Sequence, residues 1–251
     1  MSFDQFALDE KCLNVLEKQG ITKPTPIQNE AIPVALKGKD LIAVAQTGTG
    51  KTLAFSLPSV TLLAKGPRRS TRMLVLTPTR ELAQQVEKVI APMARPLGLR
   101  TVCVFGGVGM FPQTKALRSG TEIVIATPGR LLDHIDRGNV RFDSLSILTL
   151  DEADRMLDMG FLPPLRRIVE CLPEKRQTLL FSATFPDEIA HLAAAFQQDP
   201  QHIKVAGATR AVETVEQNLY TVNGSGKPEL LIKILKDPKR LMTGKSISSR
   251  E

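Results

Sequence analysis

A glycine-rich segment near the start of the chain carries the residue types that a phosphate-binding loop needs. Residues 45–52 read Ala-Gln-Thr-Gly-Thr-Gly-Lys-Thr, with a small alanine where the strict pattern has glycine. Gly48 and Gly50 let the backbone curl so that successive N–H groups face one anion. Lys51 adds a positive charge for the β- and γ-phosphates, and Thr52 offers a hydroxyl ligand to Mg²⁺. A glycine-rich turn is the alternative, but the apolar run before it and the helical pattern after it favour a nucleoside triphosphate site.

An acidic run about a hundred residues later has the complementary chemistry. Asp151, Glu152 and Asp154 follow an apolar segment at 147–150. A phosphate-loop NTPase holds Mg²⁺ with a carboxylate at a second strand end, where Asp151 lies, and Glu152 could polarise the attacking water. A charged loop after a buried strand is the alternative. Because both segments follow apolar runs, and ligands bind at the carboxyl ends of parallel strands, we favour the catalytic interpretation.

Two further turns have residues suited to phosphate oxygens. Thr77-Pro78-Thr79-Arg80 and Thr127-Pro128-Gly129-Arg130 each follow an apolar run and place a hydroxyl, a helix N-terminus and an arginine together. Such groups hold a nucleic-acid backbone without reading bases. Either turn alone could be an N-cap followed by an exposed arginine. The glycine pair at 106–107, which lets a strand of nucleic acid approach the backbone, favours a track for that backbone.

Each of these segments follows a short apolar run that we expect to be a strand of one sheet. Most of the runs are apolar on both faces, which is typical of parallel strands covered by helices on both sides. Helical patterns lie between them, as at 81–94 and 187–196. The alternation predicts an α/β fold with a mainly parallel sheet of about seven strands. The expected strands are 41–45, 73–76, 102–105, 123–126, 147–150, 178–181 and 203–205.

The composition excludes several classes of protein. Apolar residues make up 42% and charged residues 24% of the 251 residues, which is typical of a globular chain long enough to bury a core. Three scattered cysteines argue against a disulfide framework and a zinc site, and they fit a reducing cytosol. The sequence has no apolar run of the ~18 residues that span a membrane and no signal-peptide pattern at its start. We therefore expect a cytoplasmic protein without a membrane partner.

The net charge of +7 favours an anionic partner such as nucleic acid, although a lysine-rich solvated surface is the alternative. There is no tryptophan and a single tyrosine, Tyr220. A surface that stacks bases is therefore not expected. Nucleic acid should be held by its backbone.

In this order the segments resemble the motifs of the DEAD-box ATP-dependent RNA helicases of superfamily two, and bacterial members most of all. The resemblance covers about residues 3–206. It implies a three-layer RecA-like phosphate-loop NTPase domain, with ATP and Mg²⁺ as cofactors and RNA as a partner bound independently of sequence. The corresponding motifs are the Q motif at 20–28, motif I at 45–52, motif Ia at 78–83, the double glycine at 106–107, motif Ib at 127–130, motif II at 151–154 and motif III at 182–184.

The resemblance also assigns residues to ATP. Gln28 would read the adenine edge, because its amide can donate and accept at once. Phe3 lies 17 residues before Gly20, where the family has an aromatic that helps to hold adenine, and Ile21 stands where the family often has another. The implied catalytic residues are Lys51, Asp151 and Glu152, and the metal ligands are Thr52 and Asp151. The implied ATP contacts are Phe3, Ile21, Lys23, Gln28, Ala45, Gln46, Thr47, Gly48, Thr49, Gly50, Lys51 and Thr52.

For RNA, the resemblance implies contacts along motif Ia, the double glycine and motif Ib. Motif III would link the ATP site to RNA binding through hydrogen bonds toward motif II. The implied RNA contacts are Pro78, Thr79, Arg80, Gly106, Gly107, Thr127, Gly129 and Arg130, and the implied coupling residues are Asp154, Ser182 and Thr184.

The C-terminal part of the sequence resembles only the beginning of the family's second lobe. Residues 215–220 resemble its first strand and 227–235 its first helix, and the sequence contains no HRxGR-like run, which is the signature of motif VI. We therefore expect one helicase lobe at 1–206 and a linker at 207–214. At 215–251 we expect a stub of the second lobe and a disordered tail.

The sequence leaves three functions open. The first is a monomeric RNA-helicase lobe that couples ATP hydrolysis to duplex opening when the second lobe is present. The second is a truncated, non-catalytic fragment that binds RNA or a protein partner. The third is a DNA-directed or transport ATPase, against which the Q motif and the acidic tetrapeptide argue. His134, His191 and His202 lack the spacing of metal ligands, and we expect them on the surface or on helix faces.

Overall fold

The computed structural model describes residues 2–205 and 226–236. The chain divides into two compact units, Met1–Thr209 and Arg210–Glu251. The first unit contains all the motifs named above. Within the described residues, no helix is both long and apolar enough to cross a membrane.

In the second unit, the structure describes the helix α10 (Lys227–Leu235), where the sequence predicts a helix. The predicted linker at 207–214, the predicted strand at 215–220 and the tail after residue 236 lie outside the described residues. The proposed division into one lobe, a linker and a stub therefore stays a prediction.

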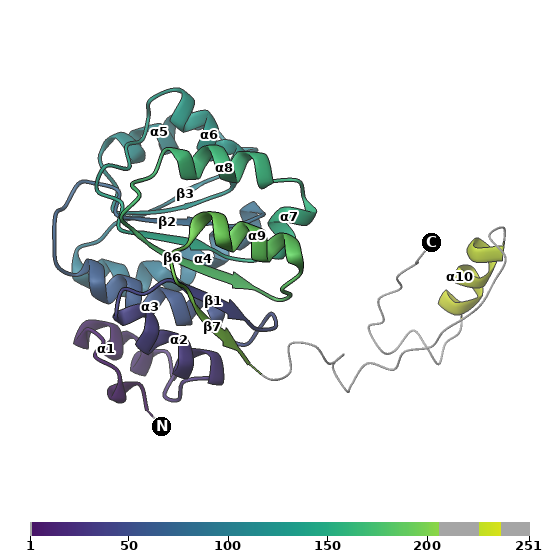
Figure 1. The fold of residues 1–251 in the computed structure, drawn as a ribbon, viewed down its shortest axis with the longest axis horizontal. Coiled ribbons are helices and arrows are strands. Elements are labelled where there is room, and N and C mark those ends of the chain that lie inside the picture. The colour runs from purple at the N-terminus through teal and green to yellow at the C-terminus, as the bar shows by residue number, and fades with distance from the viewer. Residues whose placement is uncertain (1, 206–225, 237–251) are drawn as a thin grey trace. The chain divides into compact units, whose positions relative to one another are not determined.

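The first unit is built on a seven-stranded sheet in the order β3-β4-β2-β5-β6-β1-β7, and every neighbouring pair is parallel (Figure 1). The expected parallel sheet is thus confirmed. The edge strand β7 begins two residues before its predicted start, because its polar, exposed residues hide it from a search for apolar runs. The strands are β1 (Leu41–Val44), β2 (Met73–Leu76), β3 (Thr101–Val104), β4 (Ile123–Ala126), β5 (Ile147–Leu150), β6 (Gln177–Ser182) and β7 (Gln201–Lys204).

Helices cover both faces of this sheet, which gives the three layers of an α/β fold (Figure 1). The helices α1 to α4 pack on one face and α5 to α9 on the other. They are α1 (Glu10–Lys18), α2 (Pro26–Leu36), α3 (Lys51–Leu63), α4 (Arg80–Ala94), α5 (Met110–Arg118), α6 (Pro128–Asp136), α7 (Ala153–Asp158), α8 (Leu162–Glu170) and α9 (Asp187–Phe196), with 3₁₀ turns η1 (Phe3–Gln5) and η2 (Arg95–Leu97).

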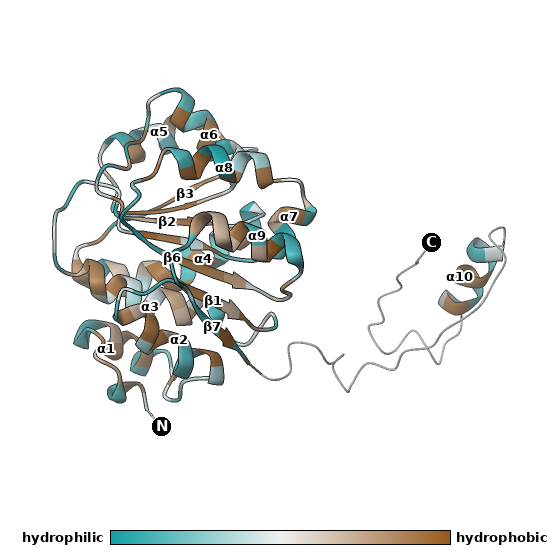
Figure 2. Ribbon diagram, viewed as in Figure 1, coloured by the Kyte–Doolittle hydropathy of each residue, from teal (hydrophilic) through white to brown (hydrophobic). Residues whose placement is uncertain are grey.

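Each strand contributes to both cores because successive side chains point to opposite faces. Leu41 and Ala43 of β1 pack with α1 to α4, whereas Ile42 and Val44 pack with α5 to α9. Figure 2 shows the apolar colour running along the strands between the two helical layers. The unbroken apolar runs in the sequence follow from this double burial.

His134 lies on a helix face, as expected, but that face is the buried one. His191 and His202 are exposed, but His134 on α6 is fully buried. Its Nε2 lies 3.3 Å from Gln113 Oε1, and its Nδ1 lies 3.2 Å from Asn139 Nδ2. Burial lowers the pKa of His134, in keeping with a neutral ring whose two nitrogens are both satisfied. Two amide side chains satisfy both ring nitrogens and so allow this burial, which the sequence did not show.

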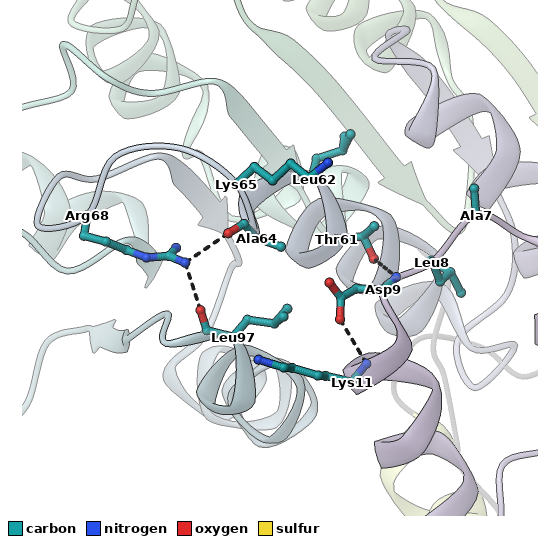
Figure 3. A pocket seen from close by; sticks show the side chains of 10 residues that line it. All are labelled: Ala7, Leu8, Asp9, Lys11, Thr61, Leu62, Ala64, Lys65, Arg68 and Leu97. Carbon is teal, nitrogen blue, oxygen red and sulfur yellow. Dashed lines mark hydrogen bonds between the residues drawn. The ribbon is translucent and has the colours of Figure 1, made fainter.

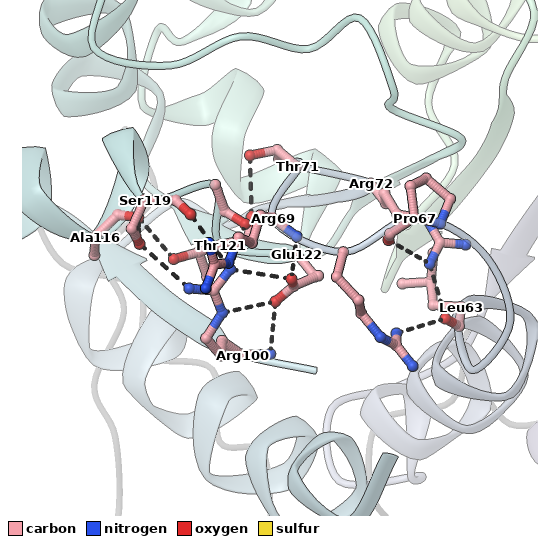
Figure 4. Close-up of polar contacts among 12 residues, drawn as sticks. Leu63, Pro67, Arg69, Thr71, Arg72, Arg100, Ala116, Ser119, Thr121 and Glu122 are labelled. Atoms are coloured by element: carbon pink, nitrogen blue, oxygen red, sulfur yellow. Dashed lines mark hydrogen bonds and ion pairs between the residues drawn. The ribbon is translucent and has the colours of Figure 1, made fainter. Parts of the chain in front are cut away.

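A buried carboxylate fastens the amino-terminal edge of the sheet. Glu122, just before β4, is 1% exposed and accepts hydrogen bonds from the backbone N–H groups of Arg69 at 2.7 Å and Arg100 at 3.0 Å. The Arg100 guanidinium adds bonds of 3.1 and 3.0 Å (Figure 4). Burial by itself would raise the pKa of Glu122, but these hydrogen bonds outweigh it and lower the pKa to about 2. Glu122 thus joins the loop before β2 to β3 and β4.

We expect the substitution Glu122→Gln to lower the free energy of unfolding by about 2 kcal/mol, because it places an amide donor against the N–H groups that the carboxylate accepts. Urea unfolding monitored by circular dichroism measures the change. The matched control is Asp136→Asn, which breaks an exposed 3.0 Å pair with Arg167 and should change stability by less than about 0.5 kcal/mol.

The same contact should make stability depend on pH. The folded-state pKa of Glu122 lies below its ordinary value of 4.5, so its contribution is complete above that pH. The contribution should be lost as the pH falls from about 4.5 toward 2. If the wild-type chain and Glu122→Gln lost stability in parallel over that range, the role assigned to this carboxylate would be wrong.

Candidate functional site

The segment predicted to bind phosphate, called the phosphate loop below, joins the end of β1 to the start of α3. β1 ends at Val44 and α3 begins at Lys51, so the loop lies at the carboxyl edge of the sheet. Gly48 and Gly50 have φ angles of 84° and 92°, which glycine adopts freely and other residues adopt only with strain. A Cβ atom on Gly50 would also lie 2.3 Å from Gln28 Nε2. A side chain at position 50 would therefore displace the Gln28 amide.

Lys51 is buried, and the loop itself holds its charge. Lys51 Nζ donates a 2.7 Å hydrogen bond to the Ala45 carbonyl, and the residue is 6% exposed. Thr49 Oγ1 donates a second 2.7 Å bond, to the Gln46 carbonyl, across the same loop. The curled backbone at the N-terminus of α3 is suited to an anion. A phosphate oxygen could therefore replace the Ala45 carbonyl as the partner of Lys51.

Gln28 connects the Q motif to the phosphate loop. It lies in the first turn of α2 and is 2% exposed. Its Oε1 accepts a 3.0 Å bond from the Thr25 N–H, and its Nε2 donates a 3.0 Å bond to the Gly50 carbonyl. An amide has two donor hydrogens and two acceptor lone pairs, so one of each remains for a ligand. Gln28 therefore keeps the donor and the acceptor that the predicted adenine contact needs. Sequence reasoning missed its bond to Gly50.

The other Q-motif residues differ in exposure. Phe3 is 3% exposed and packs in the core, edge-to-face with Phe6 at a ring-centroid distance of 6.3 Å. It therefore offers little surface to an adenine ring. Ile21 is partly buried against the same core, and Lys23 is exposed. The ATP contacts assigned to these three residues stay predictions.

Asp151 follows β5 directly and faces the phosphate loop. It is 5% exposed, and its Oδ1 accepts a 3.1 Å bond from the Glu152 N–H. Burial raises the pKa of Asp151 to about 6, although the charge of Lys51 acts in the opposite direction. A carboxylate that is buried without full compensation is suited to a divalent cation, which would restore its ionised form. The predicted metal ligand thus has the electrostatic environment that such a role needs.

Glu152 has an unusual backbone conformation, and an arginine pairs with its side chain. Its φ and ψ are 53° and 52°, a left-handed conformation that is strained for a residue with a side chain. Its carboxylate pairs with Arg155 Nη1 of α7 at 3.3 Å. The predicted catalytic role did not include Arg155, because the pairing depends on how α7 begins after the strained turn.

Asp154 joins motif II to motif III. Its Oδ2 accepts bonds from the Thr184 N–H and Thr184 Oγ1, both at 2.9 Å, and from the Ala183 N–H at 3.2 Å. Its own N–H donates a 3.3 Å bond to Ser182 Oγ. Burial would raise the pKa of Asp154, but these hydrogen bonds outweigh it and lower the pKa. All three residues predicted to couple the motifs therefore meet in one network.

The loops predicted to contact RNA also meet at the carboxyl edge. Motif Ia follows β2, and Thr79 caps α4 by accepting a 3.3 Å bond from the Leu82 N–H. Arg80, which begins α4, is exposed and pairs with Glu81 at 2.6 Å. A Cβ atom on Gly107 would lie 3.5 Å from Arg80 Nη1, so the double glycine lies next to motif Ia.

Motif Ib joins the same group from β4. Arg130 Nη1 donates a 3.0 Å bond to the Val108 carbonyl and its Nε lies 3.5 Å from Asp133 Oδ2. Gly106, Gly107 and Gly129 are exposed, whereas Pro78 is buried and Thr127 is half-buried. The three loops thus share a surface where small residues leave the backbone accessible.

Sequence reasoning missed a chain of polar contacts that leads from Arg118 to the residue before the double glycine. Arg118 Nε donates to Asn139 Oδ1 at 3.2 Å, and Asn139 contacts His134. His134 contacts Gln113, whose Nε2 donates a 3.1 Å bond to the Phe105 carbonyl, just before the double glycine. The one available signal was the position of His134 three residues after Leu131, on the apolar face of α6.

A separate pocket of about 560 Å³ lies at the other end of α3, roughly 18 Å from its first residue (Figure 3). None of the predicted site residues lines it. Two of its basic side chains bind backbone carbonyls: Lys11 Nζ lies 3.0 Å from the Pro96 oxygen, and Arg68 Nη2 lies 3.0 Å from the Ala64 oxygen. These side chains satisfy carbonyls at helix ends, and we assign the pocket no role in the site.

Curated proteins of several lineages resemble the chain. It is 42% identical over 235 residues to the DEAD-box ATP-dependent RNA helicase CshA of Streptococcus pneumoniae, covering 94% of this chain and 45% of that protein. It is 40% identical to DEAD-box ATP-dependent RNA helicase 20 of Arabidopsis thaliana (94% and 48%) and to RhpA of Helicobacter pylori (93% and 47%). The chain thus spans about half the length of these relatives.

A solved structure and a family model agree with these relatives. The crystal structure of a DEAD box protein from Methanococcus jannaschii superposes with a TM-score of 0.77 at 37% identity, over 94% of this chain and 64% of that one. The family model for the DEAD/DEAH box helicases matches residues 25–192, which include motifs I, II and III. With these motifs gathered at one edge of a parallel sheet, the chain belongs to the DEAD/DEAH box helicase family.

Proposed function

We propose that this chain is the ATP-binding and RNA-backbone-binding N-terminal lobe of a cytoplasmic ATP-dependent RNA helicase. The observation that carries this proposal is the network around Asp154, which joins the acidic motif II to motif III at 2.9 Å. It offers a physical connection between nucleotide and RNA. With a second lobe, ATP hydrolysis would be coupled to opening of an RNA duplex.

Four side chains would hold ATP and its metal ion. Lys51 would bind the β- and γ-phosphates, and Gln28 would use its remaining donor and acceptor on the adenine edge. Thr52 and Asp151 would hold Mg²⁺, which when bound neutralises charge on the phosphate oxygens. The proximity of Lys51 to Asp151, whose pKa it influences, supports a shared site for phosphate and cation.

Glu152 would orient the water that attacks the γ-phosphate. Its strained backbone fixes the start of its side chain, and Arg155 holds the carboxylate at 3.3 Å. Because Glu152 would act on water alone, its loss should affect hydrolysis more than binding. Arg155 would be a positioning residue for this carboxylate.

RNA would be held by its phosphates across motif Ia, the double glycine and motif Ib. Arg80 and Arg130 supply charge, while Gly107 lets the strand approach the backbone. Most of this affinity should be insensitive to sequence and should fall with salt, because it comes from counterion release.

Duplex opening would need a second lobe. An arginine from that lobe would stabilise the phosphoryl transition state, and such arginines contribute about 10³–10⁵ in rate. The printed sequence has no HRxGR-like run, so a lobe that binds RNA or a partner without turnover is the alternative proposal. A monomer is the proposed state for either function.

We expect Gln28→Glu to weaken ATP binding more than GTP binding. A carboxylate keeps an acceptor for the Thr25 N–H but removes the donor to the Gly50 carbonyl and the donor for adenine. Titrations with fluorescent ATP and GTP analogues measure both affinities. The control is Gln5→Glu, which alters an exposed contact with Asn29 and should leave both unchanged. Equal ATP and GTP affinities in the wild-type chain would contradict the assignment of Gln28.

We expect Glu152→Gln, in a protein that includes the second lobe, to keep ATP affinity within about three-fold and to lower the turnover number by at least about 100-fold. Lys51→Ala should instead weaken nucleotide binding itself, since it removes the charge that meets phosphate in the ground state. The measurement is ATP hydrolysis with and without RNA, beside direct nucleotide binding. RNA-stimulated turnover that survived Glu152→Gln would refute the catalytic assignment. RNA binding without any ATP hydrolysis in the unsubstituted protein would favour the alternative.

A further inference from the structure

The outer face of α5 carries an aromatic side chain that nothing in the described part of the chain covers. Phe111, the second residue of this helix, is 80% exposed. Gln113 and Leu117 form the inner face and are buried. Phe111, Lys115 and Arg118 have the spacing i, i+4 and i+7, so they share the outer face, and all three are exposed. An aromatic ring and two cations thus lie along one stripe.

This stripe begins beside the double glycine and is firmly anchored there. Gln113 donates its 3.1 Å bond to the Phe105 carbonyl, which ties the first turn of α5 to the end of β3. Val108, between the double glycine and Phe111, is 47% exposed, and its carbonyl binds Arg130. An aromatic side chain on a fixed backbone loses little conformational entropy when it binds, which favours a recognition role.

The charge around Phe111 limits the choice of partner. Lys115 and Arg118 share the outer face of α5 with Phe111, and α5 contains no acidic residue. The partner must therefore be anionic and must also present a flat apolar surface to Phe111. Single-stranded nucleic acid has both properties, since each nucleotide joins a phosphate to a base. The stripe is continuous with the loops already proposed to hold the RNA backbone.

We propose that the outer face of α5 extends the RNA track, with Phe111 stacked on one base and Lys115 paired with a neighbouring phosphate. The proposal rests on the RNA-binding function proposed above and deepens it. It adds a contact to a base where composition predicted contacts to the backbone alone. Because every base has a π face, this contact adds affinity without strong sequence preference.

The first test is the affinity of the 251-residue chain for a fluorescein-labelled single-stranded RNA, measured by anisotropy. Phe111→Ala should weaken binding by about five-fold or more, the lower range found for loss of one base–aromatic stack. The matched control is Leu62→Ala, which removes a 39% exposed apolar side chain near the far end of α3 and should leave RNA affinity unchanged. Circular dichroism melting of each variant verifies that it is folded.

Abasic RNA separates stacking from other contacts. An abasic oligonucleotide of the same length keeps every phosphate and lacks the bases. The wild-type chain and Phe111→Ala should bind it equally, because the lost interaction requires a base. The salt dependence should separate the two side chains: Lys115→Ala should lower the slope of log affinity against log salt by about 0.7, and Phe111→Ala should not change it.

Tryptophan fluorescence can report directly on stacking at position 111, because the sequence contains no other tryptophan. In Phe111→Trp the single indole should bind RNA as tightly as phenylalanine does, and its fluorescence should be quenched on addition of normal RNA but not of abasic RNA. Leu62→Trp, the matched control, should show no quenching with either.

The outcomes separate this inference from the function on which it rests. If the wild-type chain failed to bind RNA at low salt, the proposed function would fail and this inference with it. If the wild-type chain bound RNA and Phe111→Ala bound it equally well, the inference alone would be overturned, and the exposed ring would serve a partner other than RNA. Quenching that persisted with abasic RNA would also overturn the stacking role.

Discussion

Every pair of neighbouring strands in the sheet runs parallel, and this constraint decides where chemistry can take place. Parallel strands end at a common edge, so each segment that follows a strand reaches that edge. The phosphate loop after β1, motif II after β5 and motif III after β6 follow three strands that lie side by side. Because of the order β5-β6-β1, Asp151 lies near enough to Lys51 for the lysine charge to lower its pKa. The same order brings Asp154 within hydrogen-bond distance of Thr184. The three loops assigned to RNA follow β2, β3 and β4, on the other side of β5.

The proposed ATP site combines buried charges with few neutralising partners. Lys51 and Asp151 are 6% and 5% exposed, and burial still raises the pKa of Asp151 despite the nearby lysine. A site left in this state is disposed to bind a polyanion and a divalent cation together, because each satisfies a charge that the protein has taken out of water. Gln28 adds rigidity, since one amide ties the start of α2 to the phosphate loop. The parts of the site proposed for adenine and for phosphate are therefore directly connected.

Much of this could be predicted from the sequence, for a physical reason. Strands buried on both faces appear in the sequence as unbroken apolar runs. Glycine at positions 48 and 50 indicates positive φ angles, which other residues adopt only with strain. Sequence patterns did not indicate the features that long-range contacts decide. The burial of His134 depends on Gln113 and Asn139, which come from α5 and a loop. The burial of Phe3 depends on its packing with residues of several helices, and the exposure of Phe111 depends on which face of α5 meets the sheet. None of these contacts has a local pattern.

The account claims that one edge of the sheet receives both ligands, and hydrogen–deuterium exchange of backbone amides tests this claim most directly. A non-hydrolysable ATP analogue with Mg²⁺ should slow exchange in peptides covering 45–52, 151–154 and 182–184. Single-stranded RNA should slow exchange at 77–80, 105–111 and 127–130. Neither ligand should alter peptides covering 64–72 or 137–146, at the amino-terminal edge. Protection of that opposite edge by either ligand, with the carboxyl-edge loops unchanged, would contradict the account.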